Sequence, residues 1–123
     1  MIKKGICTLL FAFIFSITHL FGQEVGNATF YSDKLHGHLM ANGEKYNKDS
    51  LTCAHRTLPF GTLIRVYAPK TQREVIVKVT DRGPRSHRFI IDLSYQAAKE
   101  LGIQKFGICP VQIEVLQSKN NNQ

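Results

Sequence analysis

The chain has 123 residues, a formal net charge of +7 and sixteen basic against nine acidic side chains. A chain of this length is expected to form one small domain with a core of its own. The basic balance suits an anionic partner: a cell-wall polymer, a membrane surface or a nucleic acid. Nucleic acid is disfavoured, because no Lys/Arg cluster interleaves with aromatic residues. The chain also lacks a Gly-rich phosphate loop and a G-x-S-x-G motif.

The first 22 residues have the pattern of a secretory signal peptide. Lys3 and Lys4 form a basic start, residues 5–21 are apolar, and Gly22 is a small residue at the end. The apolar stretch is short for a membrane span and no positive charge follows it, although an uncleaved anchor remains an alternative. Cys7 lies too early for a lipid-modified cysteine at a mature N-terminus. We therefore predict cleavage after Gly22 and a soluble exported protein, periplasmic or extracellular.

The next segments predict a strand followed by a long loop. Residues 25–31 alternate between apolar and polar positions and are rich in aromatic side chains, which favours a first strand. Residues 32–50 are polar, contain turn signals at Gly37 and at Asn42-Gly43, and have no hydrophobic period. Long ordered loops in small domains are more often functional than decorative, so we expect this loop to border a site.

The rest of the chain predicts short strands and one helix. Strands are expected at residues 63–67, 74–79, 89–91 and 111–116, the first two of these forming a hairpin. Residues 51–55 have the pattern of a short strand or a buried turn. Ser94 is a suitable N-cap for a helix at residues 95–101, with Gly102 at the stop position. Residues 117–123 are a polar tail with the composition of a disordered segment. Five or six short strands and one helix predict an all-β fold, a small closed β-barrel over residues 23–116, because an open sheet of this size would expose its edges.

Residues 79–94 carry the densest concentration of polar groups that chemistry could use. Asp81 closes the apolar run 74–80 and Asp92 closes the run 89–91, with Arg82, Arg85 and Arg88 between them. Two acids at the ends of buried strands are costly unless they are paired or used. Each aspartate could instead cap a loop or a helix and pair with an arginine. Finding both in one short window, with further polar residues upstream, favours a functional site.

Four residues are candidates for catalysis: Asp81, Glu44 in the long loop, His55 and Asp92. Cleavage of a glycan requires a carboxyl group that stays protonated near neutral pH and can donate to the leaving oxygen. The helix that follows Asp92 favours its ionised form, whereas Asp81, if crowded and partly desolvated, could keep its proton. If the Arg82 guanidinium reaches Asp81, Glu44 becomes the better acid.

The histidines and cysteines leave several alternatives open. His55 lies among apolar neighbours, where a lone histidine is often a satisfied core residue. His36 and His38 match no specific metal-ligand spacing, so we expect no metal and no other cofactor. Outside the signal segment, Cys53 and Cys109 form an even pair that favours one disulfide in an oxidising compartment. Two buried free thiols, or a thiol nucleophile at Cys53, are the alternatives.

The order of the motifs resembles the RlpA-like double-psi β-barrel family of exported bacterial lytic transglycosylases. The resemblance rests on GNATFYS, MANGEKYN, LTCAHRTLPFGTLIRV, VIVKVTDRGP, RFIIDLSYQAAKELG and GICPVQIEV, which span residues 26–116. It implies a six-stranded double-psi barrel with a groove for a glycan strand. The implied reaction cleaves the β-1,4 bond between N-acetylmuramic acid and N-acetylglucosamine, with the muramyl C6 hydroxyl forming a 1,6-anhydro end.

Residue by residue, the resemblance places the family's acidic and histidine positions on Glu44, His55 and Asp81. Asp92 matches the groove aspartate of the related expansin-like and MltA-like barrels. The residues that we expect to bind substrate are Thr29, Tyr31, Arg82 and Arg88.

The chain departs from the family pattern in three ways. It lacks a lipid-attachment cysteine in the right place and a C-terminal peptidoglycan-binding repeat domain. It also has cysteine where alanine is expected at positions 53 and 109, which supports a bridge over a catalytic thiol.

The sequence thus predicts a monomeric peptidoglycan lytic transglycosylase that acts on glycan strands. It predicts no nucleic-acid partner and no stable membrane insertion after signal cleavage. The alternatives are a non-catalytic, expansin-like protein that binds or loosens the wall through the same groove, and an interaction or inhibitor protein on this barrel. The combination of Glu44, His55, Asp81 and Asp92 favours the enzyme, because a binding protein needs fewer ionisable groups in its groove.

Overall fold

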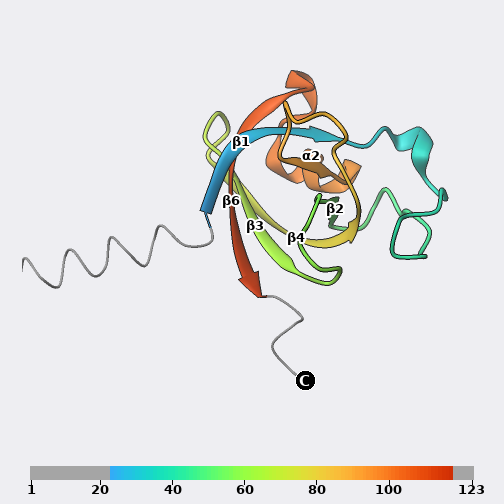
Figure 1. The fold of residues 1–123 in the computed structure, drawn as a ribbon. Coiled ribbons are helices and arrows are strands. Elements are labelled where there is room, and N and C mark those ends of the chain that lie inside the picture. The colour runs from blue at the N-terminus through green and yellow to red at the C-terminus, as the bar shows by residue number, and fades with distance from the viewer. Residues whose placement is uncertain (1–22, 118–123) are drawn as a thin grey trace, which may run out of the picture.

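The computed structural model describes residues 23–117, so the expected signal segment and residues 118–123 of the expected tail lie outside it. Six strands and one α-helix make up the domain (Figure 1). The elements in chain order are β1 (Gln23–Phe30), the 3-10 helix η1 (Asp33–Leu35), β2 (Thr52–Ala54), β3 (Leu63–Ala68), β4 (Arg73–Asp81), β5 (Ile91–Leu93), α2 (Tyr95–Leu101), the 3-10 helix η2 (Gln104–Phe106) and β6 (Cys109–Gln117).

The strands close into a barrel in the order β1-β5-β2-β4-β3-β6. Two neighbouring pairs, β1 with β5 and β2 with β4, are parallel, and the other pairs are antiparallel. Closure leaves neither edge of the sheet unpaired, which is how a domain this small avoids exposing backbone donors and acceptors. The predicted closed, mainly β barrel is confirmed.

The core follows from the alternation of apolar residues along the strands. Ile64, Val66 and Ala68 of β3 are fully buried, and their intervening neighbours are partly exposed. The helix α2 packs Ala97, Ala98 and Leu101 against the barrel. Its ends are as predicted: the Ser94 hydroxyl accepts from the Ala97 amide at 3.2 Å, and Gly102 stops the helix with a left-handed φ of 71°.

The strand expected at residues 89–91 is displaced in the structure. β5 covers Ile91–Leu93, so Asp92 lies inside a strand rather than after one. The reason is a contact that the local pattern does not reveal. The Ile90 amide donates to the Asn27 carbonyl at 2.9 Å. The Ile90 side chain also fills the space beside Gly26, where an added Cβ would come within 2.6 Å of it.

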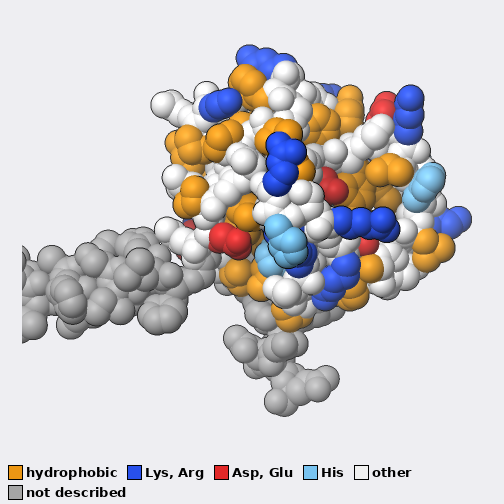
Figure 2. Space-filling model, turned by 45° about the horizontal axis from the view of Figure 1, so that its top comes forward, with side chains coloured by type: hydrophobic (Ala, Val, Ile, Leu, Met, Phe, Trp, Pro, Cys, Tyr) orange, Lys and Arg blue, Asp and Glu red, His pale blue; other side chains and the backbone are white. Residues whose placement is uncertain are grey.

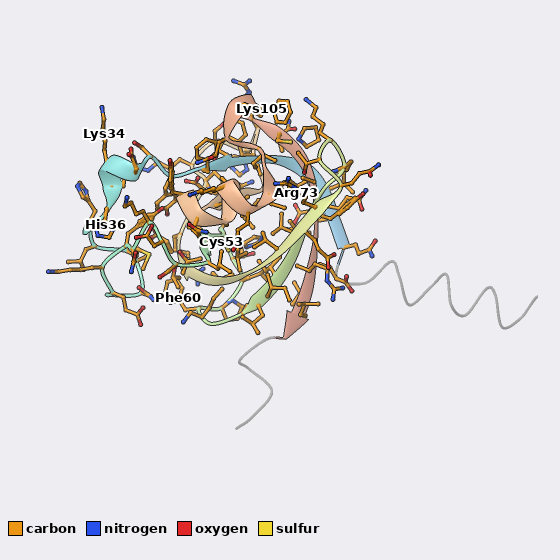
Figure 3. All side chains as sticks on the ribbon, turned by 180° about the vertical axis from the view of Figure 1, so that it is seen from behind. Lys34, His36, Cys53, Phe60, Arg73 and Lys105 are labelled. Carbon is orange, nitrogen blue, oxygen red and sulfur yellow. The ribbon has the colours of Figure 1, made fainter. Side chains whose placement is uncertain are left out.

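The expected disulfide between Cys53 and Cys109 is absent. Both are buried free thiols, Cys53 in β2 and Cys109 in β6, and Figure 3 shows Cys53 inside the barrel. The two strands are three places apart in either direction around the barrel. With neighbouring strands about 4.8 Å apart, opposite walls are roughly 10 Å apart, beyond the limit of about 7 Å between bridged Cα atoms.

The predicted long loop between β1 and β2 is confirmed and has local order. It holds η1 and an antiparallel bridge between Leu39 and Lys45. Tyr46 is 2% exposed, and its hydroxyl accepts a hydrogen bond from the Tyr95 amide at 2.8 Å. Figure 1 shows this loop projecting from one side of the barrel. Within residues 23–117, no helix has both the length and the apolar character needed to span a bilayer.

Candidate active site

The loop and the barrel enclose a cavity of about 410 Å³. Figure 2 shows one face of the molecule, where Lys and Arg side chains surround hollowed parts with acidic and apolar side chains between them. The lining residues come from the loop, from the segment after β4 and from β5: Tyr31, Leu35, His38, Leu39, Met40, Tyr46, Asp81, Arg82, Gly83, Pro84, Arg85 and Asp92. We call this cavity the groove.

The barrel topology brings Asp81 and Asp92 to the two sides of one residue. Ala54 of β2 is in register with Asp81 of β4 on one side and with Asp92 of β5 on the other. Paired residues on adjacent strands project from the same face of a sheet. Their Cα atoms are therefore roughly 10 Å apart across β2, with only the small Ala54 side chain between them. Both carboxyl groups line the groove.

Asp81 is surrounded by hydrogen-bond donors. Its Oδ1 accepts from the amides of Ala41 at 2.8 Å and of Arg82 at 2.9 Å, and its Oδ2 accepts from the Tyr31 hydroxyl. Only an ionised carboxylate is purely an acceptor, so these three donors suit the charged form of Asp81.

Asp92 has a different environment. Burial raises the pKa of its carboxyl group from the ordinary value of 3.8 to about 6, and the negative charge of Asp81 acts in the same direction. The Thr29 hydroxyl, which donates to Asp92 Oδ1 at 3.1 Å, offsets part of this increase. The sequence led us to expect that the helix would favour the ionised form of Asp92; in the structure burial acts in the opposite direction, so a protonated fraction of Asp92 persists closer to neutral pH than for an ordinary aspartate.

Tyr31 connects Asp81 to the projecting loop. Its ring packs against Tyr46 with 4.8 Å between centroids and a tilt of 53°. Burial and the hydrogen bond to Asp81 both raise the pKa of the Tyr31 hydroxyl, so it remains a donor at any physiological pH. Because Tyr46 is anchored on the helix start at Tyr95, the position of Asp81 depends on contacts from three segments.

The arginines between the two aspartates do not pair with them. The Arg82 guanidinium donates to the carbonyls of His55 at 3.1 Å and of Leu58 at 2.7 Å, and lies 4.0 Å from the centre of the Phe60 ring. Arg82 therefore reaches Asp81 only through its backbone amide. Among residues 23–117, both side-chain ion pairs involve Arg65, which contacts Glu74 and Glu114.

The four residues expected to bind substrate have different positions. Tyr31 and Arg82 line the groove, whereas Thr29 contacts Asp92. Arg88 is exposed, and its guanidinium lies 5.6 Å from the centre of the Phe89 ring. Arg85 lines the groove as well, although no sequence signal distinguishes it from its neighbours.

Glu44 lies in a neighbouring cavity rather than in the groove. That cavity, of about 270 Å³, is bordered by Glu44, Lys78 and Thr80 among others. Glu44 is exposed, and its carbonyl accepts from the Met40 amide at 2.8 Å. This turn places the Ala41 amide against Asp81. The turn at residues 40–44 therefore lies between the Glu44 side chain and Asp81, although the two residues are near each other in the fold.

His55 borders a third cavity, of about 260 Å³, with Glu24, Leu58 and Ile113. Its Nδ1 accepts from the amides of Thr57 at 3.2 Å and of Leu58 at 3.1 Å. Burial lowers the pKa of the imidazole, and the nearby arginines lower it further, although Glu24 opposes them. The neutral ring therefore carries its proton on Nε2. The His55 amide donates to the Asp81 carbonyl at 3.1 Å, so the two residues are joined through the backbone.

Sequence reasoning missed two residues that shape the groove. Tyr46 supports Tyr31, and an aromatic residue in an otherwise polar loop is the signal that could have indicated it. Arg56 donates to the carbonyls of Pro84 at 2.7 Å and Phe89 at 2.6 Å, which fixes the segment between the two aspartates. Nothing local in the sequence indicates that Arg56 has this role.

The fold and the paired aspartates identify a class, the double-psi β-barrels. The chain belongs to the RlpA-like branch of this class: the model of the lytic transglycolase family matches residues 23–113. One relative is the endolytic peptidoglycan transglycosylase RlpA of Vibrio cholerae, 42% identical in an alignment of 108 positions that covers 80% of this chain and 41% of the relative. Another is the probable endolytic peptidoglycan transglycosylase RlpA of Aquifex aeolicus, 47% identical over 92 residues, which are 75% of this chain and 41% of the relative.

The chain spans about two fifths of the length of these two relatives. Among solved structures, the apo expansin of Clavibacter michiganensis is similar, with a TM-score of 0.62 and 26% identity over 77% of this chain and 50% of that one. The Streptomyces papain inhibitor has the same fold, with a TM-score of 0.63 and 24% identity over 77% of this chain and 94% of the inhibitor.

Proposed function

We propose that this chain is a peptidoglycan lytic transglycosylase that cleaves the β-1,4 bond between N-acetylmuramic acid and N-acetylglucosamine. The observation that carries the proposal is the unequal pair of carboxyl groups in the groove. Asp92 has a pKa of about 6 and can hold a proton near neutrality, while Asp81 accepts three hydrogen bonds as a carboxylate does. Paired acids in different environments are the arrangement that most glycan-cleaving enzymes use.

The proposed reaction assigns one role to each acid. Protonated Asp92 donates to the glycosidic oxygen, which leaves on the N-acetylglucosamine as a hydroxyl group. Positive charge develops at the muramyl C1, where ionised Asp81 stabilises it. The muramyl C6 hydroxyl attacks C1 and gives its proton to Asp92, which is by then a carboxylate. One bond breaks, one forms, and Asp92 returns to its starting protonation state without consuming water.

The test is mass spectrometry of purified glycan strands after incubation with the protein. Shortened strands with 1,6-anhydro-muramyl ends are the expected product. Reducing ends would identify a hydrolase instead, and would show that water competes with the C6 hydroxyl in the groove. Unchanged strands that nevertheless bind the protein would contradict the enzymatic proposal.

The alternative is a non-catalytic glycan-binding protein. It is supported by the likeness to the Clavibacter michiganensis expansin. The exposed side chains of Leu35 and Leu39 at the border of the groove would suit the apolar face of a sugar ring. For such a protein, Asp81→Asn and Asp92→Asn would change glycan affinity without any product being formed by the parent.

Tyr31→Phe is expected to slow glycan cleavage by about tenfold. The substitution keeps the ring against Tyr46 but removes one of the three donors to Asp81, and a hydrogen bond to a charged group contributes about 1.5–3 kcal/mol. Initial rates of anhydro-end formation, with melting temperature as a fold control, measure this effect. Tyr67→Phe, on the outer wall of β3, is the matched control and should cleave at the parental rate. Equal rates for all three proteins would remove Tyr31 from the mechanism.

We further propose that the chain is exported and cleaved after Gly22. The basic start and the apolar residues 5–21 support this, as does a peptidoglycan substrate. Mass measurement of the secreted or periplasmic protein should give an N-terminus at Gln23, and fractionation should recover it without detergent. An intact Met1 on exported protein would contradict this prediction.

A further inference from the structure

A basic and apolar surface lies outside the groove, on the β3–β4 turn and on η2 with the residues that follow. Lys70, Arg73 and Lys105 are exposed there. Two large apolar side chains accompany them: Phe106 is 38% exposed and Ile108 is 43% exposed. We call these five residues the Phe106 face.

The Phe106 face joins two segments that are distant in sequence. The ammonium groups of Lys70 and Lys105 lie 4.9 and 5.2 Å from the centre of the Phe106 ring. The Thr71 hydroxyl donates to the Leu101 carbonyl at 2.7 Å, which fixes the turn to the end of α2. The fold therefore fixes the relative positions of the two segments that carry the Phe106 face.

The positive charges of this face are not neutralised by ion pairs. Among residues 23–117, the ion pairs involve only Arg65 with Glu74 and Glu114 on the barrel wall. Glu100, at the end of α2, is exposed and offsets at most one charge, and Lys99 stands beside it. An apolar ring with two ammonium groups above it favours a partner that presents negative charge and an apolar layer together.

The shape of the Phe106 face favours a membrane surface over a soluble anion as its partner. A hairpin turn and a 3-10 helix project from the barrel, and none of the cavities described above is lined by these residues. A soluble phosphate ligand needs a concave cradle of donors. A bilayer surface instead suits a projecting apolar tip with a basic collar, because the tip enters the interface while the lysines meet lipid phosphates.

We propose that the Phe106 face binds the surface of an anionic lipid bilayer. Figure 3 shows Lys105 and Arg73 well apart from Lys34 and His36, which lie on the loop that borders the groove. A protein bound through the Phe106 face therefore keeps its groove open toward the solvent side of the membrane. This inference goes beyond the proposed glycan chemistry and does not depend on it.

The test is co-sedimentation with vesicles of phosphatidylcholine containing about one third phosphatidylglycerol, against phosphatidylcholine alone. The chain from Gln23 onward is used, because it contains every strand of the closed barrel and omits the apolar residues 5–21, which would bind vesicles by themselves. The parent should bind the anionic vesicles more tightly than the neutral ones, and added salt should weaken that binding. Equal binding to both vesicles would overturn the proposal.

Matched double variants locate the surface. K70Q/K105Q is expected to bind the anionic vesicles about thirtyfold more weakly, since each lysine near such a surface contributes about fivefold. K34Q/K45Q removes the same charge from the loop that borders the groove and should change binding by less than about twofold. Phe106→Ala should weaken binding by roughly threefold to fivefold, as expected for an apolar side chain that is partly exposed in water.

Two outcomes would overturn the assignment. Equal losses in the two double variants would indicate net charge rather than this face. Binding to soluble polyphosphate without binding to vesicles would identify a different anion. Cleavage of soluble glycan strands by K70Q/K105Q should remain parental, so failure of this inference is distinguishable from failure of the proposed enzymatic function.

Discussion

Replacing Asp92 with asparagine is expected to lower the rate of glycan cleavage by about a hundredfold or more, the usual scale for a general acid. Asparagine keeps the size of the side chain and an acceptor for the Thr29 hydroxyl, but it has no acidic proton that it could transfer to the glycosidic oxygen. Glycan binding should therefore survive while cleavage is lost. The measurement is the initial rate of anhydro-end formation on soluble strands, together with strand affinity for the same preparation.

The pH profile provides a check on this role. Because the acid form of Asp92 is the active one and its pKa is about 6, parental cleavage should decline as the pH rises above that value. Residual cleavage by Asp92→Asn should lack this decline. If the variant instead cleaves at the parental rate with an unchanged pH profile, Asp92 is not the acid.

Asp81→Asn and Glu44→Gln separate the remaining assignments. Asp81→Asn should also lose about a hundredfold or more of the cleavage rate, since an amide cannot replace the charge that the three donors hold in place. Glu44→Gln tests the role that the family resemblance implies for a residue outside the groove. If Glu44→Gln loses most of the cleavage rate while Asp92→Asn cleaves at the parental rate, Glu44 is the general acid. The 40–44 turn would then have to move toward the substrate.

Local sequence signals predicted much of the fold. Alternation predicted β3 and β4, and Ser94 and Gly102 marked the ends of α2 correctly because capping depends on neighbouring residues. The position of β5 could not be predicted in this way. Ile90 and Ile91 look equivalent in sequence, but Ile90 fills the space beside Gly26, and only the tertiary fold creates that space.

Sequence reasoning selected two acids that line the groove, but it also selected Glu44 and His55, which border other cavities. Asp81 and Asp92 stood out because acids that follow apolar runs are unusual, and the groove contains both. Their environments depend on long-range contacts: Tyr31 and Ala41 reach Asp81 across 50 and 40 residues of sequence. The expected Cys53–Cys109 bridge was wrong for a similar reason, since an even count of cysteines carries no information about which walls of the barrel they occupy.

Besides slowing cleavage, Asp92→Asn is expected to raise the free energy of unfolding at neutral pH. The pKa of this carboxyl group is raised in the folded state from 3.8 to about 6, so the folded protein binds the proton more tightly than the unfolded chain. The contribution of Asp92 to stability is therefore fully present below about pH 4, where both states are protonated, and is lost as the pH rises through 6. One pKa unit corresponds to about 1.4 kcal/mol, which gives a loss of about 2–3 kcal/mol by pH 8. Asparagine does not ionise and avoids this loss.

Urea unfolding at about pH 4 and about pH 8 measures the effect. Asp92→Asn and the parent should have nearly equal free energies of unfolding at the lower pH, and the variant should be more stable by about 2 kcal/mol at the higher one. Asp49→Asn, an exposed aspartate in the long loop, is the matched control and should differ from the parent by less than about 0.5 kcal/mol at both values. A variant that is less stable than the parent at pH 8 would show that Asp92 is a structural carboxylate. Greater stability with lost cleavage is the expected result for a residue kept for its chemistry at a cost in stability.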